Sequence, residues 1–447
     1  MLHKNRVKNR THMTSFQVII ISFFCLILVG TLLLMLPISS RQRCVTSFPD
    51  AMFTAVSATC VTGLVVKDTA TYWSLFGQAV ILMLIQIGGM GVITIGLAII
   101  RASGRKIGLR QRSTMQESIS APQVGGIVKL TGFILKTSLI IEMIGAALLA
   151  PVFCNDLGIA KGLWYSLFHS ISAFCNAGFD LFGIREPFSS LTFYHSNIYL
   201  NIIIMMLIIT GGIGFLVWGD IGTHKHRIRR FSLQSKVVLM TSAVLIVLPA
   251  LYFFFYEYDR ETIHDRTIHS LFQSVTTRTA GFNTTDLAAM DESGTAIMVI
   301  LMLIGGSPGS TAGGMKTTTF AVLMGNMVAT FKRNKNIHFF ERRIDNDTVK
   351  NAATIAMMYI TLFVTGAFII NVTDGISLGK CLFETASAVG TVGLTLGITP
   401  QLGILSRIVL IILMFMGRVG GLTLIYAAFS GNGNSYSKFP EEKINIG

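Results

Sequence analysis

The apolar positions of this chain gather in blocks that are too long for the core of a soluble domain. Residues 16–36 and 74–100 contain no charged side chain, and about 20 such residues suffice for a helix to cross a bilayer. The blocks therefore predict four pairs of spanning helices. The first spans cover about 16–36, 127–152, 236–256 and 350–371, and the second spans about 77–100, 197–219, 295–325 and 404–429.

Each pair of spans encloses a short segment that recurs four times. The segment begins with a run long enough for about three helical turns and ends in a loop with one glycine before Leu or Phe. In repeats one, two and four a Phe stands ten residues before the glycine. In repeat three the nearest Phe, Phe272, stands nine residues before it, so the match is shifted there. The glycines are Gly63, Gly178, Gly281 and Gly393, spaced by 115, 103 and 112 residues.

The second spans carry a mark of their own at matching positions. Small residues in membrane helices usually allow close helix packing, and we assign these glycines that role. Two marks in register are typical of an internal repeat. The marks read Gly88-Gly-Met-Gly91, Gly211-Gly-Ile-Gly214, Gly305-Gly-Ser-Pro-Gly309 and Gly417-Arg-Val-Gly420.

The repeats predict an all-α integral membrane protein. It has four pseudo-symmetric units of helix, re-entrant pore loop and helix around a single central pore, with eight spanning helices. Non-helical backbone is tolerated at membrane depth only where protein or a water-filled cavity covers it, and four loops that meet on one axis satisfy this condition. The expected repeats are 1–113, 114–224, 225–343 and 344–430, followed by a cytoplasmic C-terminal tail at 431–447.

Charge gives this picture an orientation. Only 13% of the residues are charged, the formal net charge is +14, and basic residues cluster at 4–10, 101–112, 225–236 and 332–343. Acidic residues prefer the other loops, which is the positive-inside asymmetry of a multi-pass protein and not the pattern of a nucleic-acid binder. We therefore expect a protein of the cell membrane with both termini in the cytoplasm. A signal peptide is disfavoured because the first block is too long and no small-residue cleavage site follows it.

The recurring loops have the chemistry of a filter for a monovalent cation. A cation that loses its water needs replacement oxygens, and rings of backbone carbonyls supply them. Glycine relieves the steric cost of aiming successive carbonyls at one axis, and each preceding helix ends in partial negative charge. For any single loop, a plain turn or a packing contact is the alternative. The carbonyls expected to bind the ion belong to Cys60, Val61, Thr62, Gly63, Cys175, Asn176, Ala177, Gly178, Arg278, Thr279, Ala280, Gly281, Gly390, Thr391, Val392 and Gly393.

The third repeat departs from the others in its second span. Five glycines and one proline cannot sustain a helix there, so we predict a broken helix with an intramembrane loop just below the filter. The stretch nearly matches a phosphate-binding P-loop, but Met315 intervenes before Lys316 and both flanks are apolar. The predicted gate loop consists of Gly305, Gly306, Ser307, Pro308, Gly309, Ser310, Thr311, Ala312, Gly313 and Gly314.

Arg418 replaces the second glycine of the mark in the fourth repeat. A charge at the centre of a spanning helix costs about 2.5–3.5 kcal/mol on insertion scales, so this side chain is not expected to face lipid. Two roles stay open: it pairs with helix-end carbonyls and holds the fold, or it forms a positive barrier opposite the gate loop. We expect Arg278 to point away from the axis and Glu142 to make a polar contact between helices.

Together these features resemble the Trk/Ktr/HKT superfamily of potassium transporters, and within it the membrane subunit of bacterial Ktr-type uptake systems. The resemblance covers essentially the whole chain. Its most specific pieces are Ser387-Ala-Val-Gly-Thr-Val-Gly-Leu394, Thr276–Phe282, the gate loop and Gly417-Arg418. It implies that K⁺ binds at the filter carbonyls, that the gate loop and the arginine control its passage, and that no covalent cofactor is needed. It also implies a homodimer on a cytoplasmic ring of a nucleotide-binding regulatory subunit, with Na⁺ as an activator or a coupled ion in symport.

Other functions fit the sequence less well. A secondary transporter of another solute often shows inverted repeats, whereas these repeats share one orientation. A poorly selective channel for Na⁺ and K⁺ stays open as an alternative. An enzyme is disfavoured because the spans lack paired carboxylates, an H-E-x-x-H motif or a Ser/His constellation, and a purely structural partner because all four filter loops are complete. Six cysteines without CxxC spacing indicate neither a metal site nor a disulfide framework.

Overall fold

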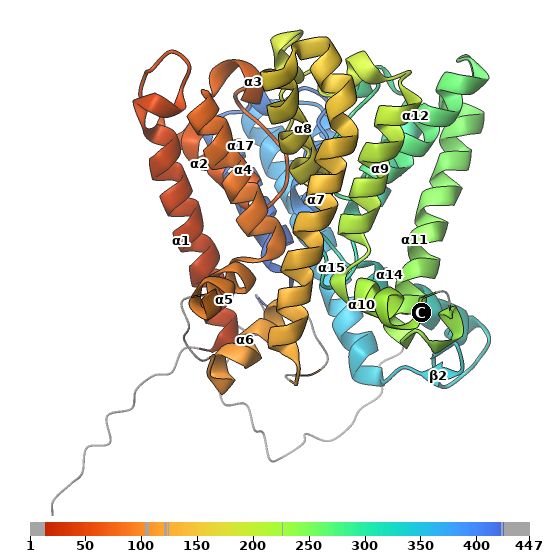
Figure 1. Cartoon of the computed structure of the whole chain (residues 1–447). Coiled ribbons are helices and arrows are strands. Elements are labelled where there is room, and N and C mark those ends of the chain that lie inside the picture. The colour runs from red at the N-terminus through yellow and green to blue at the C-terminus, as the bar shows by residue number, and fades with distance from the viewer. Residues whose placement is uncertain are drawn as a thin grey trace, which may run out of the picture.

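Upright helices stand side by side in the computed structural model, which describes residues 14–102, 107–119, 123, 125–225, 227–421 and 423 (Figure 1). Each repeat has a long first helix, a short second helix and a second apolar stretch. The long first helices are α1 (Ser15–Met35), α7 (Ile127–Leu157), α11 (Leu233–Tyr252) and α15 (Asn346–Asp374). The short helices, here called pore helices, are α2 (Phe48–Thr59), α8 (Ile159–Phe174), α12 (Ile263–Thr276) and α16 (Leu378–Gly390).

The second apolar stretches are built from shorter helices. They are α4 (Leu75–Met90) with α5 (Val92–Ala102), α9 (Ile198–Gly212) with α10 (Phe215–His224), α13 (Glu292–Leu303) with α14 (Thr317–Phe331), and α17 (Ile404–Val419). The connecting helices are α3 (Thr69–Tyr72), α6 (Leu109–Ile119), the 3-10 turns η1 (Pro37–Ser39), η2 (Phe182–Ile184), η3 (Thr192–Tyr194), η4 (Ile228–Arg230), η6 (Leu287–Ala289) and η7 (Thr399–Gln401), and the π-helical η5 (Phe253–Glu257).

Polar residues set where three of the four long first helices begin, whereas α7 begins after Gly126 without a side-chain cap. Thr14 and Gln17 form a capping box at the start of α1, in which each side chain bonds the backbone amide of the other. The side chain of Ser232 caps α11 and that of Asp345 caps α15. At its far end α15 stops at Gly375, whose φ of 66° is a usual helix terminator. Local sequence thus fixes the ends, and the apolar run fills the length between them.

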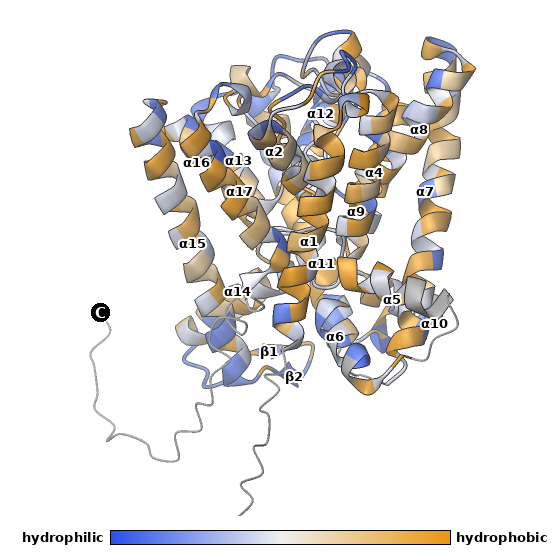
Figure 2. Cartoon of the chain, turned by 90° about the vertical axis from the view of Figure 1, so that its left-hand side faces the viewer, coloured by the Kyte–Doolittle hydropathy of each residue, from blue (hydrophilic) through white to orange (hydrophobic). Residues whose placement is uncertain are grey.

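Four helices of the described residues are long and apolar enough to cross a membrane, and these are the first helices of the four repeats, with α11 extended through η5. The bent pair α9 and α10 adds a fifth span if it is counted as one. Figure 2 shows hydrophobic residues along the middle of the upright helices and hydrophilic residues gathered at the two ends. This is the distribution expected of an integral membrane protein.

The second stretches are broken in more repeats than the sequence predicted, which placed an interruption only in the third. In repeat one the break lies at Gly91, with φ of 88°, and in repeat two at Gly214, with φ of 97°. The helices on either side of Gly214 meet at 96°. In repeat four α17 ends at Gly420, with φ of 87°. These glycines close the marks of their spans, and each adopts a left-handed backbone that other residues rarely take.

The described residues are mostly helical, as predicted, and they also contain one small hairpin. Between α14 and α15, β1 (His338–Phe339) pairs antiparallel with β2 (Arg342–Arg343), with Phe339 opposite Arg342. The hairpin lies at the end of the molecule opposite the pore helices (Figure 1). The expected tail at 431–447 lies outside the described residues, and the first 13 residues do as well.

The first glycine of three marks allows its span to touch the end of a pore helix. A Cβ added to any of them would overlap a backbone carbonyl oxygen that stands four residues before the filter glycine of the same repeat. This confirms the predicted packing role, because no side chain fits at these contacts. The contacts are Gly88 with Thr59, Gly211 with Phe174 and Gly417 with Val389.

Gly88→Ala should therefore lower the thermal unfolding midpoint of the purified protein in detergent. The added methyl group meets backbone that cannot rotate away, and such overpacking costs about 1–3 kcal/mol. Gly96→Ala in α5 is the matched control, because no atom lies within 4 Å of a Cβ at that position. Equal midpoints for the two variants would contradict the packing role of Gly88.

Candidate functional site

The four filter glycines form a closed ring, in which each lies against the loop of the next repeat. A Cβ built on any of them would press on a carbonyl oxygen of that neighbouring loop, and the loosest of these contacts, at Gly178, would be 2.9 Å long. The ring closes because the fourth glycine contacts the first repeat. The contacts are Gly63 with Ala177, Gly178 with Ala280, Gly281 with Val392 and Gly393 with Thr62.

All four loops also follow the same backbone path. The residue two places before each glycine has a positive φ, which is uncommon outside glycine. The recurrence shows that Gly281 is correctly matched to the other glycines, although Phe272 is shifted by one residue. These residues are Val61 (φ 57°), Asn176 (φ 60°), Thr279 (φ 66°) and Thr391 (φ 51°), and the glycines themselves have φ of 94°, 67°, 77° and 94°.

Hydroxyl groups of the pore helices form hydrogen bonds with the backbone of the loops. Ser57 accepts a hydrogen bond from the amide of Gly63 at 3.1 Å, and Ser387 accepts one from the amide of Gly393 at 3.0 Å. In the other two repeats the hydroxyl donates to the carbonyl of the residue after the glycine. These bonds are Ser172 to Phe179 at 2.7 Å and Thr276 to Phe282 at 2.5 Å. All four hydroxyls are buried, so each loop is fixed to its own pore helix.

The sequence contained a signal for these hydroxyls that went unused. Ser57, Ser172 and Ser387 each stand six residues before a filter glycine, and Thr276 stands five before Gly281. The repeat alignment could have shown them, but the search was confined to the loops.

The predicted gate loop exists and connects α13 to α14. Its two ends lie side by side, because the amide of Gly305 donates to the carbonyl of Met315 at 2.8 Å. The middle of the loop contacts the end of α9, where the amide of Ser307 donates to Gly212 at 3.0 Å. A Cβ added to Gly313 would overlap the hydroxyl of Thr391, one residue from the ring carbonyl of Val392. The gate loop therefore packs directly against the filter of repeat four.

Side chains satisfy the remaining polar groups of the gate loop. The hydroxyl of Thr311 donates to the carbonyl of Phe174 at 3.0 Å and lies 3.2 Å from the amide oxygen of Asn176, in the filter of repeat two. The ammonium group of Lys316 donates to the carbonyl of Ala312 at 2.8 Å. Sequence reasoning considered this lysine only for phosphate binding, and the structure instead shows that it closes the loop on itself.

The guanidinium of Arg418 bridges the gate loop and the first repeat. It donates to the carbonyl of Thr311 in the loop, and to the carbonyls of Gly88 and Gly89 at 2.5 and 2.9 Å at the end of α4. The pairing with helix-end carbonyls, one of the two roles left open, is thus observed. The contact to Thr311 also places the charge opposite the loop, as the second role requires. The two roles are compatible.

Two further polar residues lie as the sequence predicted. The Arg278 guanidinium is 3.5 Å from the carbonyl of Gly305 and lines a small cavity with residues of α9 and α11, so its side chain lies behind the gate loop. Glu142 is 2% exposed, and both of its oxygens accept from the amide of Gln86, at 2.9 and 3.1 Å. Glu142 therefore joins α7 to α4 as an interhelix contact.

A cavity of about 200 Å³ borders the gate loop. It is lined by Gly89, Glu117, Ser310, Lys316 and Arg418 among others. Residues of the gate loop and Arg418 line this cavity, whereas none of the four ring glycines does. Within the described residues no cluster of three or more His, Cys, Asp or Glu side chains has the geometry of a metal site.

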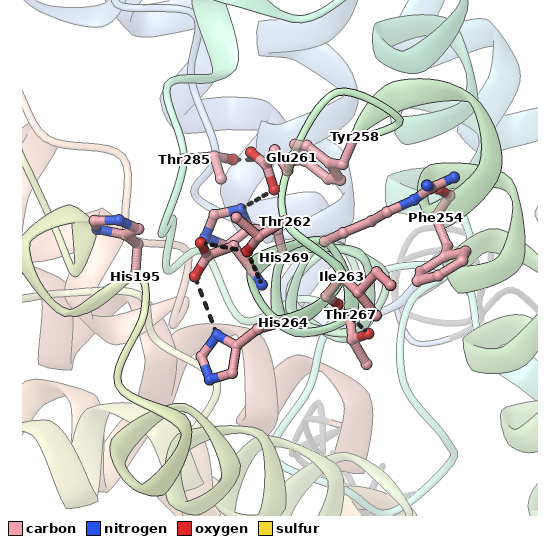
Figure 3. A network of polar contacts seen from close by, with 12 residues as sticks. His195, Phe254, Tyr258, Glu261, Thr262, Ile263, His264, Thr267, His269 and Thr285 are labelled. Carbon is pink, nitrogen blue, oxygen red and sulfur yellow. Dashed lines mark hydrogen bonds and ion pairs between the residues drawn. The ribbon is translucent and has the colours of Figure 1, made fainter.

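A polar network surrounds pore helix α12 near its first residues (Figure 3). His269 lies 2.7 Å from Glu261 through Nδ1, and Tyr258 shares a hydrogen bond with Thr285 at 3.1 Å. At the first turn, hydrogen bonds from Thr262, Ser196 and His264 lower the pKa of Asp265 to about 2. The carboxylate is thus ionised at neutral pH at the amino-terminal end of a helix, where negative charge is favourable.

Comparison with known proteins places the chain among transporters. Residues 1–436 match the family model TrkH, described as cation transport protein. The chain is 40% identical over 455 residues to the potassium/sodium uptake protein NtpJ of Enterococcus hirae, covering 99% of both chains. It is 38% identical to the Ktr system potassium uptake protein B of Bacillus subtilis, covering all of both chains. The crystal structure of the potassium transporter TrkH from Vibrio parahaemolyticus matches with a TM-score of 0.73 at 19% identity, over 95% of this chain and 86% of that one.

Proposed function

Because the chain belongs to the TrkH family of cation transport proteins, we propose that it is the ion-translocating subunit of a potassium uptake system in the cell membrane. The observation that carries this proposal is the ring of four glycines, in which four loops of equal backbone path meet. The relatives described as potassium uptake proteins align with the chain along its whole length. The family is one of transporters, so we assign the chain no enzymatic reaction.

The proposed filter works through the backbone. Each repeat contributes carbonyls from the four residues that end at its glycine, such as Cys60 to Gly63 and Gly390 to Gly393. Rings of carbonyl oxygens replace the hydration shell of the ion, while positive φ at two positions of each loop turns the carbonyls. The first residues, Cys60 and Cys175, cap their pore helices, so the partly negative helix ends face the same region.

The proposed gate consists of residues Gly305 to Gly314 and Arg418. In the conformation described here Arg418 is bonded to Thr311 and to the end of α4. A fixed positive charge below the filter opposes a passing cation, so conduction requires that the loop and the arginine move apart. Many glycines in the loop permit such a movement, because glycine has the widest choice of backbone angles.

The finer architecture is also part of this proposal. We assign eight spans, with each broken second stretch counted as one, and repeats at the boundaries 1–113, 114–224, 225–343 and 344–430. Both termini are assigned to the cytoplasm because the clusters of basic residues lie in the sequence between the repeats and before the first one, and such clusters favour the cytoplasmic side. The family resemblance further suggests a homodimer that works with a cytoplasmic nucleotide-binding regulatory subunit.

Sodium is the second candidate cargo or coupled ion. One relative at 40% identity is described as a potassium/sodium uptake protein, so a filter that passes both ions, or symport of Na⁺ with K⁺, is the specific alternative to potassium uptake alone. The flux measurement described next distinguishes potassium uptake alone from a filter that passes both ions.

The purified protein in liposomes should take up ⁸⁶Rb⁺ in an assay with an outward K⁺ gradient. Unlabelled K⁺ should compete at lower concentration than Na⁺ if the filter is selective. The measurement is made with and without the candidate regulatory subunit from the same cell. Absence of cation flux in both cases would contradict the proposed function, and equal competition by Na⁺ would favour the unselective alternative.

Gly393→Ser should reduce the preference for K⁺ over Na⁺ by about tenfold or more. The added Cβ would overlap the carbonyl oxygen of Thr62 and sit at a φ of 94° that disfavours a side chain, so the ring must distort. Gly379→Ser, at the start of the same pore helix, is the control because no atom lies within 4 Å of a Cβ there. Unchanged selectivity in the Gly393 variant would mean that the filter lies elsewhere.

Arg418→Ala should raise the rate of ⁸⁶Rb⁺ flux, because it removes the charge on the path and the three hydrogen bonds that join the gate loop to the end of α4. Arg418→Lys keeps the charge with fewer fixed donors and should give an intermediate rate. The thermal midpoint of each variant reports whether the fold survives. A folded alanine variant with unchanged or lower flux would show that the arginine is only a structural contact.

A further inference from the structure

The four pore helices differ at the position nine residues before the filter glycine. Repeat one has Thr54, whose hydroxyl donates to Asp50 within its own helix at 2.9 Å. Repeat two has His169, repeat three has Phe272 and repeat four has Glu384. All four side chains are buried. The asymmetry is notable because the loops that follow share one backbone path.

Glu384 holds the segment that leaves the filter of repeat four. Its residue is fully buried, with 0% exposure. The hydroxyl of Thr395, two residues after Gly393, donates to Oε2 at 2.8 Å, and the hydroxyl of Thr399 donates to Oε1. The Thr395 hydroxyl in turn accepts from the amide of Gly397 at 3.1 Å. One carboxylate thus ties two points of this segment to the pore helix.

These contacts make the carboxylate an acceptor on both oxygens. Among the described residues no ion pair includes Glu384, and its carboxylate accepts hydrogen bonds from the two threonines. A buried carboxylate is costly unless its oxygens are bonded, and hydrogen bonds to a charged group are stronger than neutral ones. The two hydrogen bonds therefore offset the cost of placing this carboxylate in the interior.

In repeat two a histidine, and not a carboxylate, bonds the pore helix to the segment after the filter glycine. His169 accepts from the amide of Leu181 at 3.2 Å through Nε2, and its Nδ1 lies 2.7 Å from the carbonyl of Tyr165 in the pore helix. Leu181 stands three residues after Gly178. Two of the four repeats therefore fasten the outgoing segment through the same position of the pore helix.

We propose that Glu384 is a positioning residue of the cation filter: its carboxylate binds the Thr395 and Thr399 hydroxyls and thereby fixes the segment after Gly393, which sets the ring contact between Gly393 and Thr62. This inference rests on the proposed function. Glycine leaves the backbone free to adopt other angles, so the ring contact keeps its geometry only if the chain on both sides is held. Ser387 fixes the near side through the amide of Gly393, and Glu384 fixes the far side.

The test measures ⁸⁶Rb⁺ uptake into liposomes, with the KM for Rb⁺ and the inhibition by Na⁺ determined for each variant. Glu384→Ala should raise the KM about tenfold and weaken the exclusion of Na⁺, since both hydrogen bonds to the threonine hydroxyls are lost. Glu384→Gln keeps one acceptor oxygen and should recover part of the loss. Thr54→Val, at the same position of repeat one, is the matched control and should leave both quantities unchanged.

Thr399→Val and Thr399→Ser make the test independent of whether the Glu384 variants fold. Valine keeps the volume and removes the hydroxyl, so KM and Na⁺ inhibition should shift in the same direction as in Glu384→Ala, whereas serine should restore them. A purely structural bond would change the thermal midpoint while leaving KM and Na⁺ inhibition as in the wild type. That outcome, or a glutamine variant no better than alanine, would overturn the proposal.

The wild-type protein in the same preparation separates this inference from the proposed function. If the wild type shows no cation flux, the proposed function itself fails. If the wild type conducts and Thr399→Val has the wild-type KM and Na⁺ inhibition, only the role of Glu384 is refuted.

Discussion

The need to satisfy backbone polar groups away from water governs this structure. Four loops and a broken helix bring non-helical backbone into the interior of a membrane protein, where each unpaired group costs several kcal/mol. The gate loop meets this constraint with partners from three repeats: the end of α9, the carbonyl of Gly417, and the cationic side chains of Lys316 and Arg418. These cations bond to carbonyls rather than to carboxylates. The positive charges that hold the loop are therefore neutralised by carbonyl dipoles and not by a buried acid.

The same constraint explains how the filter ring is held. A ring of glycines around one axis has few side chains of its own, so its geometry depends on what stands behind it. Buried hydroxyls such as Ser57 and Ser387 bond the loops to the pore helices, and glycines such as Gly88 let the second spans press against the ends of those helices. In repeat four Glu384 adds a second anchor beyond the glycine. The four repeats share one backbone path through the loop. They differ in the polar side chains that bond to it.

Much of this arrangement could be predicted from the sequence, because the decisive residues are glycines in register. Gly63, Gly178, Gly281 and Gly393 identified the ring, and the run of glycines around Pro308 identified the gate loop. The breaks at Gly91 and Gly214 were missed because one glycine between two apolar runs leaves the hydrophobic pattern intact. The partners of Arg418 and Lys316 could not be predicted at all, since they are carbonyls from distant repeats that any residue provides. Sequence patterns thus indicated where the backbone lacks helical hydrogen bonds, and only the fold shows which groups bond to it there.

The central claim is that the four loops bind a potassium-like cation through their carbonyls on one axis. It is tested most directly by locating Rb⁺ or Tl⁺ through anomalous scattering in crystals of the protein. The account predicts density on the axis, in contact with carbonyl oxygens of Thr62, Ala177, Ala280 and Val392, that weakens when Na⁺ replaces the heavier ion. Heavy-ion density bound only elsewhere, with none inside the ring of glycines, would contradict the account.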